Sequence, residues 1–189
     1  MIDSKKILNI TSPKEFEKNS IKIFNYQFKN NTIYREFCNL TGKNPSDIKF
    51  SFEIPFFPIQ FFKTHKIVSS NQQIQKTFHS SGTTKDNLSK HHVTDLKHYE
   101  NCLLKIFMDF YGQPSKYNII ALLPTYRENK NSSLIYMINY LIKKSKNINS
   151  GFHLNNYKEL KKKLIHLEKG HKKTILFGVS YALLNLIDL

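Results

Sequence analysis

The sequence predicts an α/β fold in which N-terminal helices are followed by alternating strands and helices that form a mainly parallel sheet. Two observations support this prediction: amphipathic helical patterns precede residue 112, and apolar strands alternate with helices from residue 117 onward. The chain has 189 residues, which suits one domain with a sizeable core better than two. We therefore expect a single domain over residues 1–189.

The N-terminal part of the chain carries clear helix boundaries. In "SPKE", Ser12 can cap a helix, Pro13 suits its first turn, and Glu15 completes a capping box. A second helix, rich in aromatic residues, follows and should end at Gly42. The first helix should therefore begin next to Ser12.

The middle of the chain is harder to assign. Residues 52–67, "FEIPFFPIQFFKTHKI", contain two prolines and five phenylalanines, which favours a buried, irregular segment. A short strand should then lead into a loop rich in hydroxyl groups. After that loop, Thr94 or Asp95 can cap a helix that ends at Gly112. We expect one apolar face on this helix, formed by Leu96, Tyr99, Leu103, Ile106 and Phe110.

Strands and helices alternate in the last third of the chain. Strands are predicted at residues 117–123, 151–154 and 173–179. The intervening helices are predicted at 132–144, with Ser132 or Ser133 as cap, and at 156–170, and another starts near residue 180. This alternation indicates parallel strands joined by right-handed crossovers. Ligands of such sheets bind beyond the carboxyl ends of the strands, which here follow Phe78, Leu123 and Phe177.

Composition narrows the possible functions. The net charge is +15 and the pI is about 9.7. A surface with this excess of positive charge attracts phosphate groups non-specifically. The basic residues are nearly all lysine and are scattered, so a nucleic-acid or anionic-membrane surface is the less favoured interpretation. Two lone cysteines argue against a zinc site and a disulfide framework, and His91, His92 and His98 lack the spacing of a helical metal pair. Neither a membrane-spanning run nor a signal peptide is visible, so we expect a cytoplasmic protein.

The stretch "FHSSGTTKDNLSKHHVTD", residues 78–95, concentrates hydroxyl groups around one glycine. Successive backbone N–H groups and rotatable hydroxyls within one turn can hold a phosphate, and Gly82 lets the main chain approach it closely. The stretch lacks the second glycine followed by Lys and Ser or Thr that a Walker loop needs. An ordinary polar turn remains the alternative.

Four segments together resemble a known family. The acyl-protein synthetase (LuxE) family has similar segments in the same order. Along this chain they are "IPFFPIQFFKTHKI", "SSGTTKDNLSKH", "LLPTYRENKNSSLIYMINYLI" and "LFGVSYALLNL". The resemblance covers the chain from about residue 15 onward. It implies an adenylate-forming ligase that uses ATP and Mg²⁺ to convert a fatty or other carboxylic acid into an acyl-adenylate. The acyl group would then pass to a protein thiol.

The resemblance also implies site residues. The phosphates of ATP would be held by Ser80, Ser81, Gly82, Thr83, Thr84 and Lys85, flanked by Ser89 and His92. The acyl or adenine pocket would be lined by Pro124, Thr125, Tyr126, Gly178, Ser180 and Tyr181. Lys85 stands where the family has a second glycine, so it either contacts phosphate or marks a copy without turnover. No residue is assigned to a chemical step.

Adenylate-forming enzymes continue well beyond the segment that "LFGVSYALLNL" matches. We therefore expect the chain to be the N-terminal portion of such an enzyme, inactive by itself and partnered by a C-terminal half. A non-catalytic relic or interaction domain with the same fold is the alternative. Without its partner, the portion should expose apolar surface around Leu176, Leu183, Leu184 and Ile187.

Overall fold

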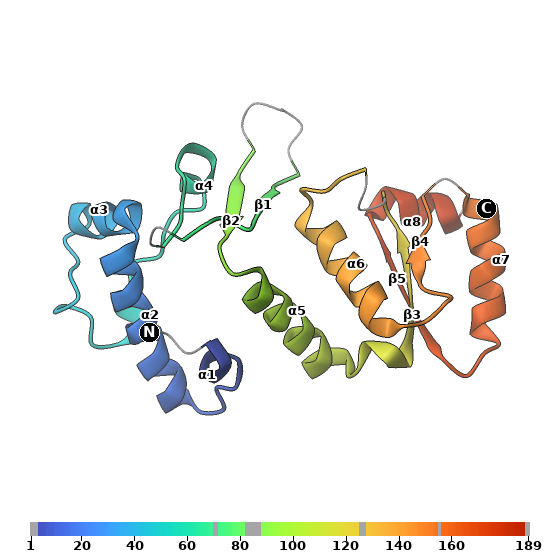
Figure 1. The fold of residues 1–189 in the computed structure, drawn as a ribbon, viewed down its shortest axis with the longest axis horizontal. Coiled ribbons are helices and arrows are strands. Elements are labelled where there is room, and N and C mark those ends of the chain that lie inside the picture. Colours follow the sequence, from blue (N-terminus) through green and yellow to red (C-terminus); the bar gives the residue numbers. More distant parts are fainter. Residues whose placement is uncertain (1–3, 70–71, 82–87, 125–127, 155, 188–189) are drawn as a thin grey trace. The chain divides into compact units, whose positions relative to one another are not determined.

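The structure, a computed structural model, describes residues 4–69, 72–81, 88–124, 128–154 and 156–187 (Figure 1). The chain divides into two compact units, Met1–Tyr99 and Glu100–Leu189, and each is described by itself below. The α/β class is confirmed, because helices precede a parallel sheet. Within the described ranges, no helix has the length and apolar character needed to cross a bilayer.

The first unit opens with three helices: α1 (Ser4–Leu8), α2 (Pro13–Asn30) and α3 (Thr32–Leu40). The Ser12 hydroxyl accepts a hydrogen bond from the backbone N–H of Glu15 at 3.2 Å, which confirms the predicted cap. The Glu15 carboxylate accepts from the backbone N–H of Thr11 at 3.1 Å, one residue before the position that a capping box uses. The chain leaves α3 through Gly42, whose φ of +67° suits glycine.

An aromatic core joins α2 and α3. Phe24, Tyr34, Cys38 and Ile48 are buried together, and Phe57 packs against them. The Tyr34 hydroxyl donates to the backbone carbonyl of Pro55 at 2.8 Å, and burial raises the pKa of this phenol well above its usual range. Side-chain contacts therefore hold the following segment against the helices.

That segment is irregular, as predicted, apart from the short helices η1 (Ser51–Glu53) and α4 (Phe61–Thr64). The prediction that it is buried was wrong in part. Phe57 enters the core, whereas Phe52 and Phe56 are 77% and 83% exposed. Neighbouring side chains on an extended backbone point in opposite directions, so only one of two consecutive phenylalanines can face the core.

The hydroxyl-rich stretch lies in a hairpin. Strand β1 (Lys76–His79) pairs with β2 (Lys90–Val93) in an antiparallel, two-stranded sheet, with Thr77 opposite His92 and His79 opposite Lys90. The polar sequence "KHHV" gave no strand signal, so β2 was not predicted. The placement of the loop at the carboxyl end of a parallel strand was also wrong, because β1 is paired within this hairpin.

The second unit contains a parallel sheet in the order β4-β3-β5. Its elements are α5 (Leu96–Tyr111), whose first turn belongs to the first unit, then η3 (Pro114–Lys116), β3 (Tyr117–Leu122), α6 (Ser133–Ser145), β4 (Gly151–Phe152), α7 (Tyr157–Glu168), β5 (Lys173–Gly178) and α8 (Ser180–Ile187). The predicted strands are confirmed, although β4 has two residues instead of four. The cap of α6 is Ser132, which accepts from the backbone N–H of Ile135 at 3.3 Å.

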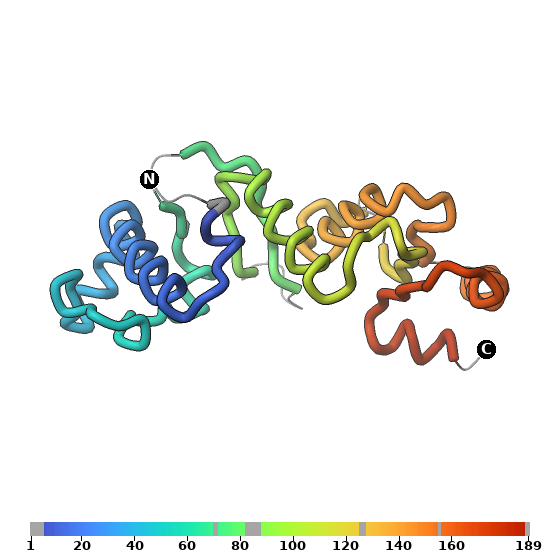
Figure 2. Tube along the Cα trace, turned by 90° about the horizontal axis from the view of Figure 1, so that it is seen from below, coloured from blue at the N-terminus to red at the C-terminus, as the bar shows by residue number. Residues whose placement is uncertain are grey.

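Helices cover both faces of this sheet. Phe107 of α5 and Leu141 of α6 pack on Ile119 at one face, and Leu160 of α7 and Leu186 of α8 belong to the cluster at the other. Figures 1 and 2 show α6 and α7 on opposite sides of β3. The unit is therefore a three-layer α/β/α arrangement around β3.

The predicted apolar face of α5 needs a correction. Asp95 caps the helix by accepting from the backbone N–H of His98 at 2.8 Å, and Gly112 follows it with a φ of +79°. Leu103 and Phe107 contact the sheet cluster, whereas Ile106 and Phe110 are exposed. Residues three and four apart share a helix face, so spacing alone could not separate Leu103 and Phe107 from Ile106 and Phe110; the packing of α5 against its neighbours decides which of them are buried.

The last helix was expected to expose apolar surface. Leu184 and Ile187 are exposed, as predicted. Leu176 and Leu183 are half-buried against the cluster beneath α7 and α8, so the prediction was wrong for these two.

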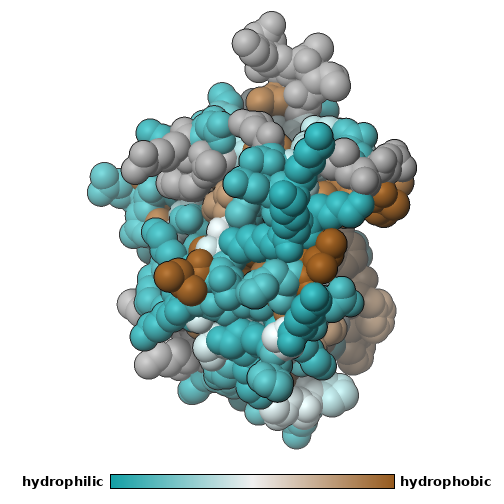
Figure 3. Space-filling model, turned by 90° about the vertical axis from the view of Figure 1, so that its right-hand side faces the viewer, coloured by the Kyte–Doolittle hydropathy of each residue, from teal (hydrophilic) through white to brown (hydrophobic). Residues whose placement is uncertain are grey.

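On α7, Lys158, Lys161, Lys162 and Lys169, which follows its end, are exposed. Figure 3, a view toward the side that carries α7 in Figure 1, shows a mainly hydrophilic surface with separate apolar patches. Part of the high net charge is therefore carried by a solvated helix face.

Candidate functional site

Two serines close the base of the predicted phosphate loop. The backbone N–H of Ser80 donates to the carbonyl of Ser89, and the backbone N–H of Ser89 donates to the Ser80 hydroxyl oxygen, both at 3.0 Å. The structure thus brings together two of the predicted phosphate-binding residues, and exposed Ser81 follows the first of them. Gly82, Thr83, Thr84 and Lys85 lie outside the described residues.

His92 lies further along β2. Its Nδ1 is 2.9 Å from the hydroxyl oxygen of Thr77, its partner across the hairpin. Burial, followed by the charges of Lys66 and Lys90, lowers the pKa of this imidazole. His92 is therefore neutral near pH 7. Its side chain contacts Thr77 of β1, three residues along β2 from Ser89.

The described part of the hairpin offers hydroxyl and ammonium groups. Residues 76–81 and 88–93 contain serine, threonine, histidine and lysine but no carboxylate, and Lys90 is exposed next to Ser89. In the described ranges of the whole chain, no group of three or more His, Cys, Asp or Glu side chains is arranged to hold a metal ion. These donors suit an anion such as phosphate better than a bare divalent cation.

The predicted pocket residues follow two neighbouring strands of the second unit. Leu122 and Gly178 are opposite each other in the parallel register of β3 and β5, so the segments that follow them leave the sheet at the same edge. Pro124 follows β3, and Ser180 and Tyr181 begin α8 with exposed side chains. Thr125 and Tyr126 lie outside the described residues.

Gly178 has a packing role of its own. A Cβ at this position would lie 2.7 Å from Cδ2 of Leu183 on α8, closer than carbon atoms approach in proteins. The glycine therefore allows α8 to pack onto the ends of β3 and β5. The hairpin residues belong to the first unit and these residues to the second, so a site shared by both sets stays a prediction.

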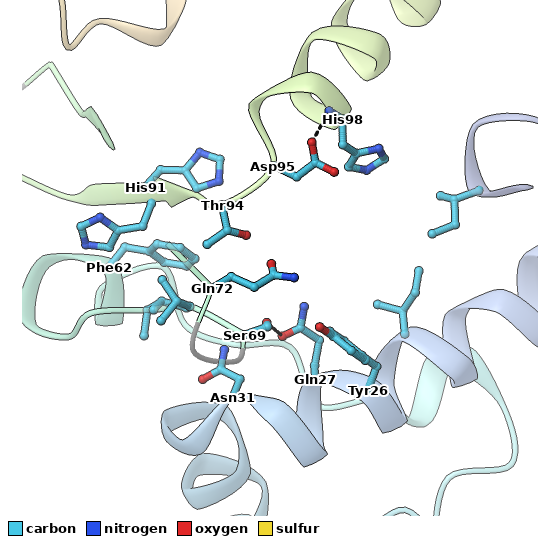
Figure 4. Close-up of a pocket in the computed structure, with 15 residues that line it drawn as sticks. Tyr26, Gln27, Asn31, Phe62, Ser69, Gln72, His91, Thr94, Asp95 and His98 are labelled. Atoms are coloured by element: carbon cyan, nitrogen blue, oxygen red, sulfur yellow. Dashed lines mark hydrogen bonds between the residues drawn. The ribbon is translucent and has the colours of Figure 1, made fainter. Parts of the chain in front are cut away.

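Sequence reasoning missed a cavity in the first unit. Its volume is about 740 Å³, and side chains from α2, residues 67–69, Gln72, β2 and the start of α5 line it (Figure 4). Polar side chains among them include Gln27, Asn31 and Gln72. These segments are distant in the sequence and share no motif, so no local pattern could have indicated the cavity.

Comparison with known proteins gives a family. The model of the acyl-protein synthetase family LuxE matches residues 9–185. No curated protein and no solved structure matches the chain. Because the family model covers nearly the whole chain, this protein belongs to the acyl-protein synthetase (LuxE) family, a family of ligases.

Proposed function

We propose that this protein takes part in the ATP-dependent activation of a fatty acid or other carboxylic acid, followed by transfer of the acyl group to a protein thiol. Family membership over residues 9–185 is the observation that carries this proposal. The hairpin adds support, because its paired serines hold the two ends of a hydroxyl-rich stretch together.

In this reaction, a carboxylate oxygen attacks the α-phosphorus of ATP, and the bond to the bridging oxygen breaks, releasing pyrophosphate. A thiolate then attacks the acyl carbonyl carbon and AMP leaves. Ser80, Ser81 and residues 82–84 would hold the β- and γ-phosphates, while Lys85 and Lys90 would balance their charge. Mg²⁺, if bound with the nucleotide, would supply positive charge that stabilises the departing pyrophosphate.

The remaining predicted residues would bind the other parts of the substrates. Pro124, Thr125 and Tyr126 would line the acyl or adenine pocket from the segment after β3, and Gly178, Ser180 and Tyr181 would line it from the start of α8. The common strand edge that carries Pro124 and Gly178 supports this grouping.

The test removes hydroxyl donors and preserves side-chain shape. The double variant Thr83→Val, Thr84→Val should weaken ATP binding, because each hydrogen bond lost to a charged group costs about 1–3 kcal/mol. Isothermal titration calorimetry measures ATP affinity, and acid-dependent ATP–pyrophosphate exchange measures the first chemical step.

Thr32→Val is the matched control, because this threonine is exposed at the start of α3. Unchanged ATP affinity in the double variant would reject the phosphate assignment. ATP binding that depends on these threonines, without exchange for any acid even when a C-terminal half is supplied, would instead favour a non-catalytic binding domain, the alternative that Lys85 in place of the family glycine supports.

A further inference from the structure

The cavity of the first unit is lined by both polar and apolar side chains. Gln27 and Asn31 lie along its floor, and Thr94 and Asp95 lie opposite them. Ile23, Phe62, Ile67 and Val68 contribute apolar wall. A volume of about 740 Å³ falls within the range of small-molecule sites in proteins.

The side-chain amide of Asn31 has a hydrogen-bond donor without an acceptor among the described residues. The residue is only 5% exposed, and its Oδ1 caps α3 by accepting from the backbone N–H of Tyr34 at 3.1 Å. Its Nδ2 donates to none of the described residues, and Figure 4 shows the amide nitrogen on the side nearer Ser69. A buried amide donor without a protein partner is unusual in a folded protein and indicates a missing acceptor.

Gln27 presents a second donor beside the first. Its Oε1 accepts a hydrogen bond from the Ser69 hydroxyl, which fixes the orientation of the amide. Figure 4 shows the Gln27 nitrogen pointing away from this bond and into the cavity, and among the described residues it has no acceptor. Gln27 therefore directs an N–H group into the cavity, and the amide of Asn31, on the other side of Ser69, also lines it.

The opposite wall offers acceptors. One oxygen of Asp95 accepts from the backbone N–H of His98, and Figure 4 shows the other oxygen free of that bond and close to the cavity that Thr94 also borders. A ligand that fits both walls needs an acceptor toward α2 and a donor toward Asp95. A carboxamide carries both groups on one carbon atom.

The charges of the cavity disfavour an anion. No lysine or arginine is among its described lining residues, and Asp95 supplies a carboxylate. Burial lowers the pKa of His91 and, with nearby lysine charges, of His92, so both imidazoles are neutral near pH 7. A carboxylate ligand would meet the negative charge of Asp95 without a matching cation on the walls.

From this arrangement we infer that the first unit contains a second ligand site, which binds an uncharged carboxamide attached to an apolar chain. The carbonyl oxygen of the ligand accepts from Gln27 and Asn31, its N–H group donates toward Asp95, and the chain lies against Ile23 and Ile67. The acid substrate of the proposed chemistry is anionic, so the ligand inferred for this cavity is a different molecule, although His92 lines the cavity and was also predicted to flank the phosphates of ATP.

The ligand prediction is tested with three eight-carbon probes that differ only in their polar end: octanamide, octanoate and octylammonium. Calorimetric titration of the 189-residue chain should show that octanamide binds at least about tenfold more tightly than either ion. A factor of about ten corresponds to one hydrogen-bonded polar group. Equal or tighter binding of octanoate or octylammonium, or no saturable binding of the amide, would overturn the inference. ATP affinity is measured in parallel and tests the proposed function independently.

Two variants locate the site. Gln27→Glu keeps the acceptor for Ser69, and Asn31→Asp keeps the cap of α3, but each replaces an N–H donor by an oxygen. Each should weaken octanamide binding about tenfold or more. The control Gln73→Glu adds the same charge at an exposed residue outside the cavity and should leave the affinity unchanged. Full affinity in both test variants with intact circular dichroism spectra would show that the amide binds elsewhere.

Discussion

The two units of this protein differ in the interactions that stabilise the interior of each. In the second unit, Ile119, Ile120, Ala121 and Leu122 of β3 are completely or almost completely buried between helices on both faces. In the first unit, aromatic rings and a hydrogen bond from Tyr34 hold an irregular segment against two helices. The core of the second unit is therefore built on one buried strand, whereas the first unit depends on side-chain contacts between helices and an irregular segment.

The largest effect is expected in the second unit. Leu160→Ala empties a completely buried position on α7, so the free energy of unfolding should fall by about 2–5 kcal/mol. Urea unfolding measures the change, and hydrogen exchange assigns it to the second unit. Ile165→Ala on the same helix is the control, because Ile165 is 51% exposed, and should cost far less. Similar losses in the two variants would contradict the packing described for β3.

A smaller effect is expected in the first unit. Tyr34→Phe removes the hydroxyl that donates to the carbonyl of Pro55 and leaves that acceptor unpaired, so the free energy of unfolding should fall by about 1–2 kcal/mol. Tyr157→Phe, a half-buried tyrosine of the second unit, is the control. Urea unfolding compares the two variants. If Tyr34→Phe costs nothing, the irregular segment is held by ring packing alone.

The smallest effect concerns pH and the hairpin. Burial and two lysines lower the pKa of His92 in the folded protein, so the unfolded state takes up a proton more readily. Above the unfolded pKa of about 6.5 the imidazole is neutral in both states and its contribution to stability is complete. As the pH falls below that value and through the folded pKa, this contribution is lost.

The measurement is the urea midpoint as a function of pH. On acidification, the urea midpoint of His92→Gln should fall less than that of the unmodified chain. At alkaline pH the difference between the two midpoints should not change with pH. An identical pH dependence in both proteins would show that His92 is not desolvated in the hairpin.

Local signals in the sequence predicted the parts of the fold that depend on local physics. The Ser12 cap, the Gly42 stop and strand β3 follow from hydrogen-bonding capacity, backbone freedom and an unbroken apolar run. Burial of single side chains was predicted less well. Phe56 and Ile106 are as apolar as Phe57 and Phe107, and only the direction of the backbone decides which of them faces the core.

In the candidate site too, local features could be predicted from the sequence, whereas features that depend on tertiary packing could not. The hydroxyl-rich stretch was visible in the sequence, but the pairing of Ser80 with Ser89 depends on β2, whose polar residues resemble a loop. The burial of the Asn31 amide could not be predicted either, because Asn31 was recognisable at most as a helix cap and its burial depends on tertiary packing.

The close approach of Leu183 to Gly178 has an evolutionary consequence. Positions 178 and 183 share one small volume, since a single added methyl group at 178 would overlap the leucine side chain. Among relatives that keep this packing, a larger residue at 178 should therefore occur together with a smaller or shifted side chain at 183. Glycine at 178 can thus be maintained by its neighbour on α8 even in a relative that has lost every ligand.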